Sequence, residues 1–129
     1  MIYYISAAQV IALHQAVIQR FGGSEGLRDK GALESAIGRP AMTFGGEDLY
    51  PDIAAKAAAM MHCLVLNHPF IDGNKRVGVA AAELFVLVNG WDLRATDEDL
   101  EDLTLSVARG DMVIEPLTIW FRQRLTQQR

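Results

Sequence analysis

Residues 52–89 read DIAAKAAAMMHCLVLNHPFIDGNKRVGVAAAELFVLVN, and this stretch decides the fold. It contains two largely apolar segments, 52–67 and 74–89, each long enough for about four turns of helix. Pro69 ends the first segment because proline cannot continue a helix. Beyond its first turn, the second segment is apolar on nearly every side. A helix of that kind is normally buried, so we expect the second helix to lie at the centre of the fold.

Glu83 is the single charge in the apolar part of the second segment. A buried carboxylate needs a partner, because the loss of its hydration must be offset. We therefore expect Glu83 to have a structural role, paired internally with an arginine or a helix N-terminus. A role near Arg76, seven residues earlier on the same face, is the alternative.

The segments on either side also predict helices, with one irregular region between them. The expected helices follow the capping boxes at 6–9 and 96–99, span 29–38, and run from Pro116 through Leu125. Between Pro40 and Pro51, Gly45-Gly46 is a turn signal and favours a loop or small hairpin. These elements predict a compact all-α bundle of five or six helices with a small β-hairpin, as a single domain over residues 1–129.

Composition and charge limit the classes of function. Half of the 129 residues are hydrophobic, enough for one real core. The net charge of -4, without a long basic run, argues against direct binding of nucleic acid. No apolar run reaches the roughly 18 residues that span a bilayer, and the first residues lack the basic region of a signal peptide. We expect a cytoplasmic protein that does not enter a membrane.

The loop between the two central helices carries the chemistry. His68 follows the first helix and can accept a proton near neutral pH, where imidazole ordinarily titrates. Gly73 and Asn74 begin the next helix, whose first backbone N–H groups have no helical partner and favour an anion. Lys75 and Arg76 add two positive charges to the same turn.

A metal ligand completes this set. Asp72 provides the carboxylate oxygen that magnesium prefers, and magnesium usually takes its other ligands from phosphates and water. A base, a metal ligand, a phosphate cradle and two cations are the groups that phosphoryl or nucleotidyl transfer requires. The spacing therefore indicates a transferase that acts on a nucleotide.

The nine residues HPFIDGNKR, at 68–76, resemble the signature loop of the Fic/Doc family, in particular its Doc (death-on-curing) branch. The stretches 21–29, 31–37 and 49–51 are also similar to that branch. The resemblance implies a Fic-like helical fold, with the signature loop at 68–76 and a flap at about 41–50. In the family, the flap aligns the target segment by strand-like pairing.

The resemblance also implies a role for each residue of the loop. His68 matches the general base, Phe70 the aromatic anchor of the loop, and Asp72 the ligand of Mg²⁺. The turn that binds the phosphates of the co-substrate ATP is matched by Gly73, Asn74, Lys75 and Arg76.

Two positions distinguish the chemistries of this family. Members that transfer AMP usually have glycine at the position of Lys75 and a second arginine at the position of Val79. The resemblance therefore implies the Doc-type kinase reaction, in which the γ-phosphate of ATP moves to a protein hydroxyl. The implied target is elongation factor Tu, whose phosphorylation halts translation. The alternative is AMP transfer (adenylylation) to a protein hydroxyl.

The same resemblance implies a type II toxin–antitoxin system. The partner would be a cognate Phd-like antitoxin, with a DNA-binding part and an inhibitory tail. Two other functions are compatible with the fold. One is a catalytically silent binding module in an antitoxin complex. The other is an RNA-cleaving toxin that uses His68 with Lys75 and Arg76, which the acidic net charge disfavours.

Overall fold

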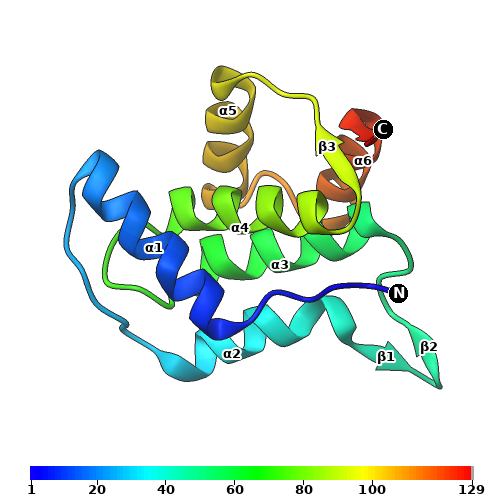
Figure 1. Cartoon of the computed structure of the whole chain (residues 1–129), viewed down its shortest axis with the longest axis horizontal. Coiled ribbons are helices and arrows are strands. Elements are labelled where there is room, and N and C mark those ends of the chain that lie inside the picture. Colours follow the sequence, from blue (N-terminus) through cyan, green and yellow to red (C-terminus); the bar gives the residue numbers. More distant parts are fainter. Residues whose placement is uncertain (129) are drawn as a thin grey trace.

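The computed structural model describes residues 1–128 and confirms a helical fold with a small hairpin (Figure 1). The elements in chain order are α1 (Ala7–Phe21), α2 (Lys30–Gly38), a 3₁₀ turn (Arg39–Ala41), β1 (Thr43–Phe44), β2 (Glu47–Asp48), α3 (Ile53–Asn67), α4 (Asn74–Val88), β3 (Trp91–Leu93), α5 (Asp97–Ala108), α6 (Ile114–Arg124) and β4 (Leu125–Gln127). Within the described residues, no helix is long and apolar enough to cross a membrane.

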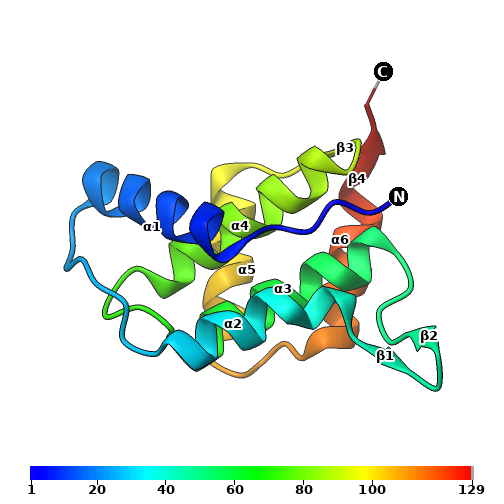
Figure 2. The same cartoon turned by 60° about the horizontal axis from the view of Figure 1, so that its bottom comes forward.

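Helix α3 is the most enclosed element. Every side chain from Ala54 to Met61 is buried, and most of these side chains are alanine methyl groups. Small side chains keep the helix thin, so neighbouring helices can approach it closely. Helices α2, α4, α5 and α6 all contact α3, and Figures 1 and 2 show it running through the middle of the bundle.

Helix α4 lies beside α3, as expected for an apolar helix, but one of its faces is open to solvent. Leu87 and Val88 are exposed near its C-terminal end, and Glu83 is exposed as well. The expectation that Glu83 is paired internally is wrong, because none of the ion pairs among residues 1–128 includes this carboxylate. Partial desolvation and the Asp97 carboxylate raise the pKa of Glu83.

Gly78 sets how closely α4 can approach α3. A Cβ atom at this position would lie 2.7 Å from Val65 Cγ2, so the Val65 side chain or one of the two helices would have to move. We expect Gly78→Ala to lower the free energy of unfolding by about 1–3 kcal/mol, the usual cost of overpacking. Urea unfolding followed by circular dichroism measures this difference.

Gly38→Ala is the matched control for that substitution. Gly38 has ordinary helical dihedral angles, and its added Cβ would meet no atom within 4 Å. Here alanine restricts the unfolded chain without a clash, so the free energy of unfolding should rise by about 0.5–1 kcal/mol. Equal destabilisation by both substitutions would contradict the close-approach explanation.

The last helix ends one residue earlier than its apolar pattern predicts, and it begins at Ile114 rather than near Pro116. Leu125 was expected in the helix, yet α6 ends at Arg124 and the chain continues as strand β4. Strand β4 pairs antiparallel with β3, with Trp91 opposite Gln127. In this way the backbone of β3 gains hydrogen-bond partners. The stability gained from these bonds outweighs that of one more turn of helix.

The hairpin expected at 41–50 forms, with β1 paired to β2 around the Gly45-Gly46 turn. Buried Lys56 anchors it: Nζ donates to Pro40 O at 3.1 Å and to Asp48 Oδ2 at 3.2 Å. The hairpin stands at the N-terminal end of α3, and both views place it away from the loop that follows α3 (Figures 1 and 2). The length of α3 separates the two by roughly 20 Å.

Candidate functional site

His68 occupies an unusual backbone conformation at the C-terminus of α3. Its φ of 48° and ψ of 60° lie in the left-handed region, and it is the only non-glycine residue with positive φ among residues 1–128. The turn ends α3 and leaves the imidazole exposed. The ring is therefore accessible to a substrate, as a general base must be.

Asn74 holds the loop from inside. Its side chain is buried; Oδ1 accepts from the Phe70 N–H at 3.0 Å and Nδ2 donates to Phe70 O at 2.9 Å. The same Nδ2 lies 3.3 Å from His68 Nδ1, so the amide also orients the ring weakly. The side chain of Asn74 is thus used within the loop, and only its backbone N–H is free to face a phosphate.

Asp72 is exposed and carries two backbone hydrogen bonds. Oδ1 accepts from the Gly73 N–H at 2.8 Å and Oδ2 from the Ser24 N–H at 3.1 Å. The Ser24 and Gly73 bonds are the main reasons why the pKa of Asp72 lies below its ordinary value, and the nearby His14 and Lys75 lower it further. The carboxylate is therefore ionised at neutral pH and fixed in position.

The first turn of α4 presents free backbone N–H groups and two cationic side chains. Gly73 adopts the left-handed conformation that a side chain would strain, with φ 76°. In the described chain, the N–H groups of Asn74, Lys75 and Arg76 donate to no protein acceptor. Lys75 and Arg76 are exposed beside them, and the Arg76 guanidinium lies 4.0 Å from the centre of the Phe21 ring.

Two buried aromatic rings stack on each other on the inner side of this loop and support it. Phe70 is fully buried and stacks on His14 of α1, with ring centroids 3.9 Å apart. His14 Nε2 donates to Asp72 O at 2.8 Å. The sequence pattern predicts a satisfied, buried histidine at position 14. Its contact with the signature loop, 58 residues away, has no sequence signal.

The segment between α1 and α2 forms the wall of the loop. Phe70 and Leu27 form an isolated bridge, and the Ile71 N–H donates to Gly26 O at 3.0 Å. A Cβ atom at Gly23 would lie 2.6 Å from Asp72 Oδ2, so glycine is required where this wall meets the carboxylate. Arg28, whose side chain reaches two carbonyls at the end of α3, was not predicted as a site residue.

Magnesium fits Asp72 only together with phosphates. No group of three or more His, Cys, Asp or Glu side chains in the described chain could hold a metal by itself. Each oxygen of Asp72 uses one lone pair for a backbone N–H, which leaves a second lone pair for a cation. This matches the usual mode of magnesium binding, with one carboxylate plus phosphate oxygens and water.

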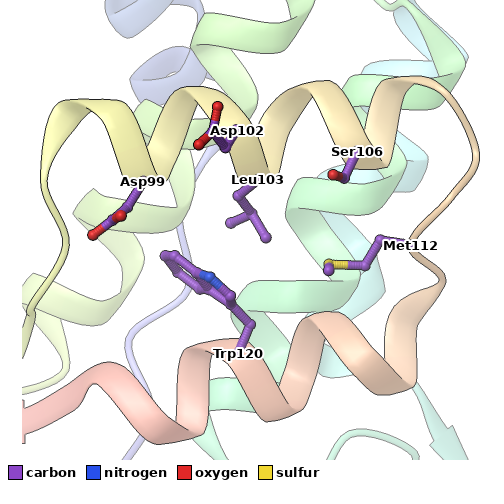
Figure 3. Close-up of a pocket in the computed structure, with 6 residues that line it drawn as sticks. All are labelled: Asp99, Asp102, Leu103, Ser106, Met112 and Trp120. Carbon is purple, nitrogen blue, oxygen red and sulfur yellow. The ribbon is translucent and has the colours of Figure 1, made fainter.

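A shallow pocket lies elsewhere, between α5 and α6. Figure 3 shows the Trp120 ring pointing from α6 toward α5, with two carboxylates at the rim. Its lining residues are Asp99, Asp102, Leu103, Ser106, Met112 and Trp120. Asp99 Oδ2 already accepts from the Thr96 N–H in the capping box of α5. None of the site residues expected from the sequence lines this pocket.

The sequence of this chain is similar to that of known proteins, and the similarity includes the signature loop. The model of the Fic/DOC family matches residues 4–86, more than half of the chain. Toxin Doc of Mycolicibacterium smegmatis is 43% identical over 100 residues, which cover 75% of this chain and 76% of that protein. Protein kinase doc of Escherichia phage P1 is 33% identical over 120 residues, which cover 93% and 94% of the two chains.

Proposed function

The chain belongs to the Fic/DOC family, and on that premise we propose that it is a Doc-type toxin with protein kinase activity. It transfers the γ-phosphate of ATP to a protein hydroxyl in a magnesium-dependent reaction. The observation that carries the proposal is the placement of His68, Asp72 and the free N–H groups of α4 around one exposed turn.

The proposed reaction moves one proton and one phosphoryl group. The imidazole of His68 takes the proton of the incoming hydroxyl. The hydroxyl oxygen forms a bond to the γ-phosphorus, and the bond from phosphorus to the β–γ bridging oxygen breaks. ADP leaves with that electron pair, and the product is a phosphorylated protein.

The rest of the turn orients and neutralises the phosphates. The backbone N–H groups of residues 74–76, with the Lys75 and Arg76 cations, bind phosphate oxygens. Magnesium, when bound, supplies positive charge between the phosphate oxygens and the Asp72 carboxylate. Asn74 and Phe70 keep the loop rigid, so that little reorganisation is needed during the reaction.

Lys75 and Val79 favour kinase activity over AMP transfer. The Lys75 side chain occupies space beside the anion turn that a glycine would leave for a phosphate. Val79 is half-buried against the core and offers no charge to a nucleotide. In a Fic-like site, both features favour the orientation of ATP that presents its γ-phosphate.

We expect the double substitution Lys75→Gly with Val79→Arg to redirect the enzyme toward AMP transfer. The glycine frees space at the turn, and the arginine adds the second cation of the AMP-transferring pattern. Label transfer from α-labelled ATP should rise and transfer from γ-labelled ATP should fall. Lys75→Gly alone is the control for loss of charge, and a melting curve checks that arginine is accepted at position 79. Retained γ-phosphate transfer alone in a folded double variant would contradict the orientation argument.

The direct test uses purified protein, magnesium, elongation factor Tu and ATP labelled at the α- or the γ-phosphate. We propose elongation factor Tu as the target because the signature loop resembles that of the Doc branch. Label from the γ position, lost in His68→Ala, supports the kinase. Label from the α position means AMP transfer. No label from either position contradicts the proposed activity on this target.

The proposed biological setting is a toxin–antitoxin system in the cytoplasm. A Phd-like antitoxin would restrain the activity until it is removed. A catalytically silent module in that complex is the second candidate, but His68, Asp72, Lys75 and Arg76 are all exposed on one turn, which favours an enzyme. Addition of the antitoxin to the label-transfer assay tests the inhibition.

A further inference from the structure

Arg28 contacts the end of α3 immediately next to His68. Its Nε donates to His68 O at 2.6 Å, and its Nη2 donates to Asn67 O at 2.8 Å. The backbone N–H groups of Arg28 and Asp29 both donate to Pro69 O, at 2.8 and 3.0 Å. The segment before α2 therefore binds three consecutive carbonyls, from Asn67 to Pro69.

These contacts provide hydrogen-bond partners for carbonyls that the helix itself leaves without one. The last carbonyls of a helix have no helical partner, and a cation near a helix C-terminus is favourable. A non-glycine residue in the left-handed region persists only when its surroundings hold it there. His68 is such a residue. The Arg28 guanidinium binds the carbonyl oxygen of His68 itself and that of the preceding residue, Asn67.

Two nitrogens of the guanidinium, Nε and Nη2, are engaged in these contacts. No carboxylate in the described chain forms an ion pair with Arg28. Its planar fork spans two carbonyl oxygens at once, which a lysine ammonium on a flexible stem does not reproduce. The contact joins residues 40 positions apart and connects the α1–α2 segment directly to the signature loop.

We propose that Arg28 is a positioning residue for His68: by fixing the carbonyls of Asn67 and His68, it holds the imidazole at the anion turn of α4. This inference rests on the proposed function, because it assigns a role in the same reaction. In this role Arg28 acts through the backbone carbonyls and not by contact with the nucleotide or the hydroxyl. Its loss should lower kcat and leave the KM for ATP nearly unchanged, since in the described chain no hydrogen bond or ion pair joins Arg28 to the phosphate turn at residues 73–76.

The test compares Arg28→Ala, Arg28→Lys and a matched control, Lys30→Ala. Lys30 is an exposed cation two residues away, paired with Glu34 on α2 at 3.8 Å, and has no contact with the loop. A misplaced catalytic group costs roughly 100-fold in rate, so kcat of Arg28→Ala should fall by about that factor. Arg28→Lys should recover only a small part of the loss, and Lys30→Ala should match the unchanged protein.

A spectroscopic readout separates this inference from the proposed activity. The ring Cε1–Hε1 signal of His68, assigned by its absence in His68→Ala, should be single in the unchanged protein and in Lys30→Ala. It should split or broaden in Arg28→Ala. If the unchanged protein transfers no phosphate but the signal responds in this way, the proposed function fails and the positioning role stands. An unchanged signal, or a kcat for Arg28→Ala within threefold of the control, overturns the positioning role.

Discussion

His68→Ala is expected to abolish phosphoryl transfer and to leave the free energy of unfolding nearly unchanged. General-base catalysis contributes roughly 100- to 10,000-fold to a rate, and alanine offers no group that can accept the proton. The imidazole is exposed, and its one hydrogen-bond contact with another side chain is the 3.3 Å approach to Asn74. The ring therefore contributes little to packing. Label transfer from γ-labelled ATP and urea unfolding measure the two quantities.

His68→Gly is the matched control for the backbone. Glycine adopts the left-handed conformation without strain, whereas alanine retains the strain that histidine already has. If the ring acts as base, both variants should lose activity equally, and glycine should be the more stable of the two. Activity retained by either variant would contradict the assignment of His68 as base.

Asp72→Asn is expected to give the second largest loss, about 100- to 1,000-fold in transfer, because it removes charge stabilisation at the phosphates. Asparagine retains one oxygen that can accept a backbone N–H, so the loop should stay folded. Transfer by this variant should no longer increase when magnesium is added. A magnesium titration of the transfer rate, with isothermal calorimetry of ATP binding, checks both expectations.

The low pKa of Asp72 also predicts how its contribution to stability depends on pH. Backbone hydrogen bonds stabilise the ionised carboxylate, so its folded pKa lies below that of the unfolded chain. The stability that it contributes is present above the unfolded pKa of about 4 and is lost as the pH falls through the folded value. Wild type and Asp72→Asn should therefore differ in stability at neutral pH and converge in acid.

Asp111→Asn is the charge-matched control for Asp72→Asn. Asp111 is an exposed carboxylate paired with Arg109 at 3.3 Å, and neither residue belongs to the signature loop. The control should respond to magnesium as the unchanged protein does. A magnesium response retained by Asp72→Asn would show that the metal is held by other groups.

The helices could be predicted from the sequence because their signals are local. The capping boxes at Ser6 and Thr96 begin α1 and α5, and Asp29 and Asp52 cap α2 and α3. Each of these signals involves residues three positions apart. Strand β4 has no such signal, because its partner Trp91 lies 36 residues from Gln127, and only the tertiary arrangement decides that Leu125 leaves the helix.

The residues of the candidate site also form two groups, one that the sequence predicts and one that it does not. His68, Asp72 and the turn at 73–76 are contiguous in sequence, so their types and spacing predict the chemistry. The contacts of Arg28 and His14 with the loop join residues 40 and 58 positions apart, and nothing in the sequence indicates that they meet.

The hairpin was predicted correctly as an element, but its distance from His68 follows from the direction of α3. A target segment paired along its edge would lie far from the base, so the alignment role implied by the resemblance does not fit this arrangement.

The pairing of β3 with β4 has a consequence for the order of folding during synthesis. Leu117 and Phe121 of α6 are fully buried in the core against α3, and Gln128 donates to Gly90 O at 3.0 Å. The core around α3 is therefore complete only when α6 has packed against it. A nascent chain that ends before α6 is expected to remain sensitive to protease, because its apolar core is still exposed.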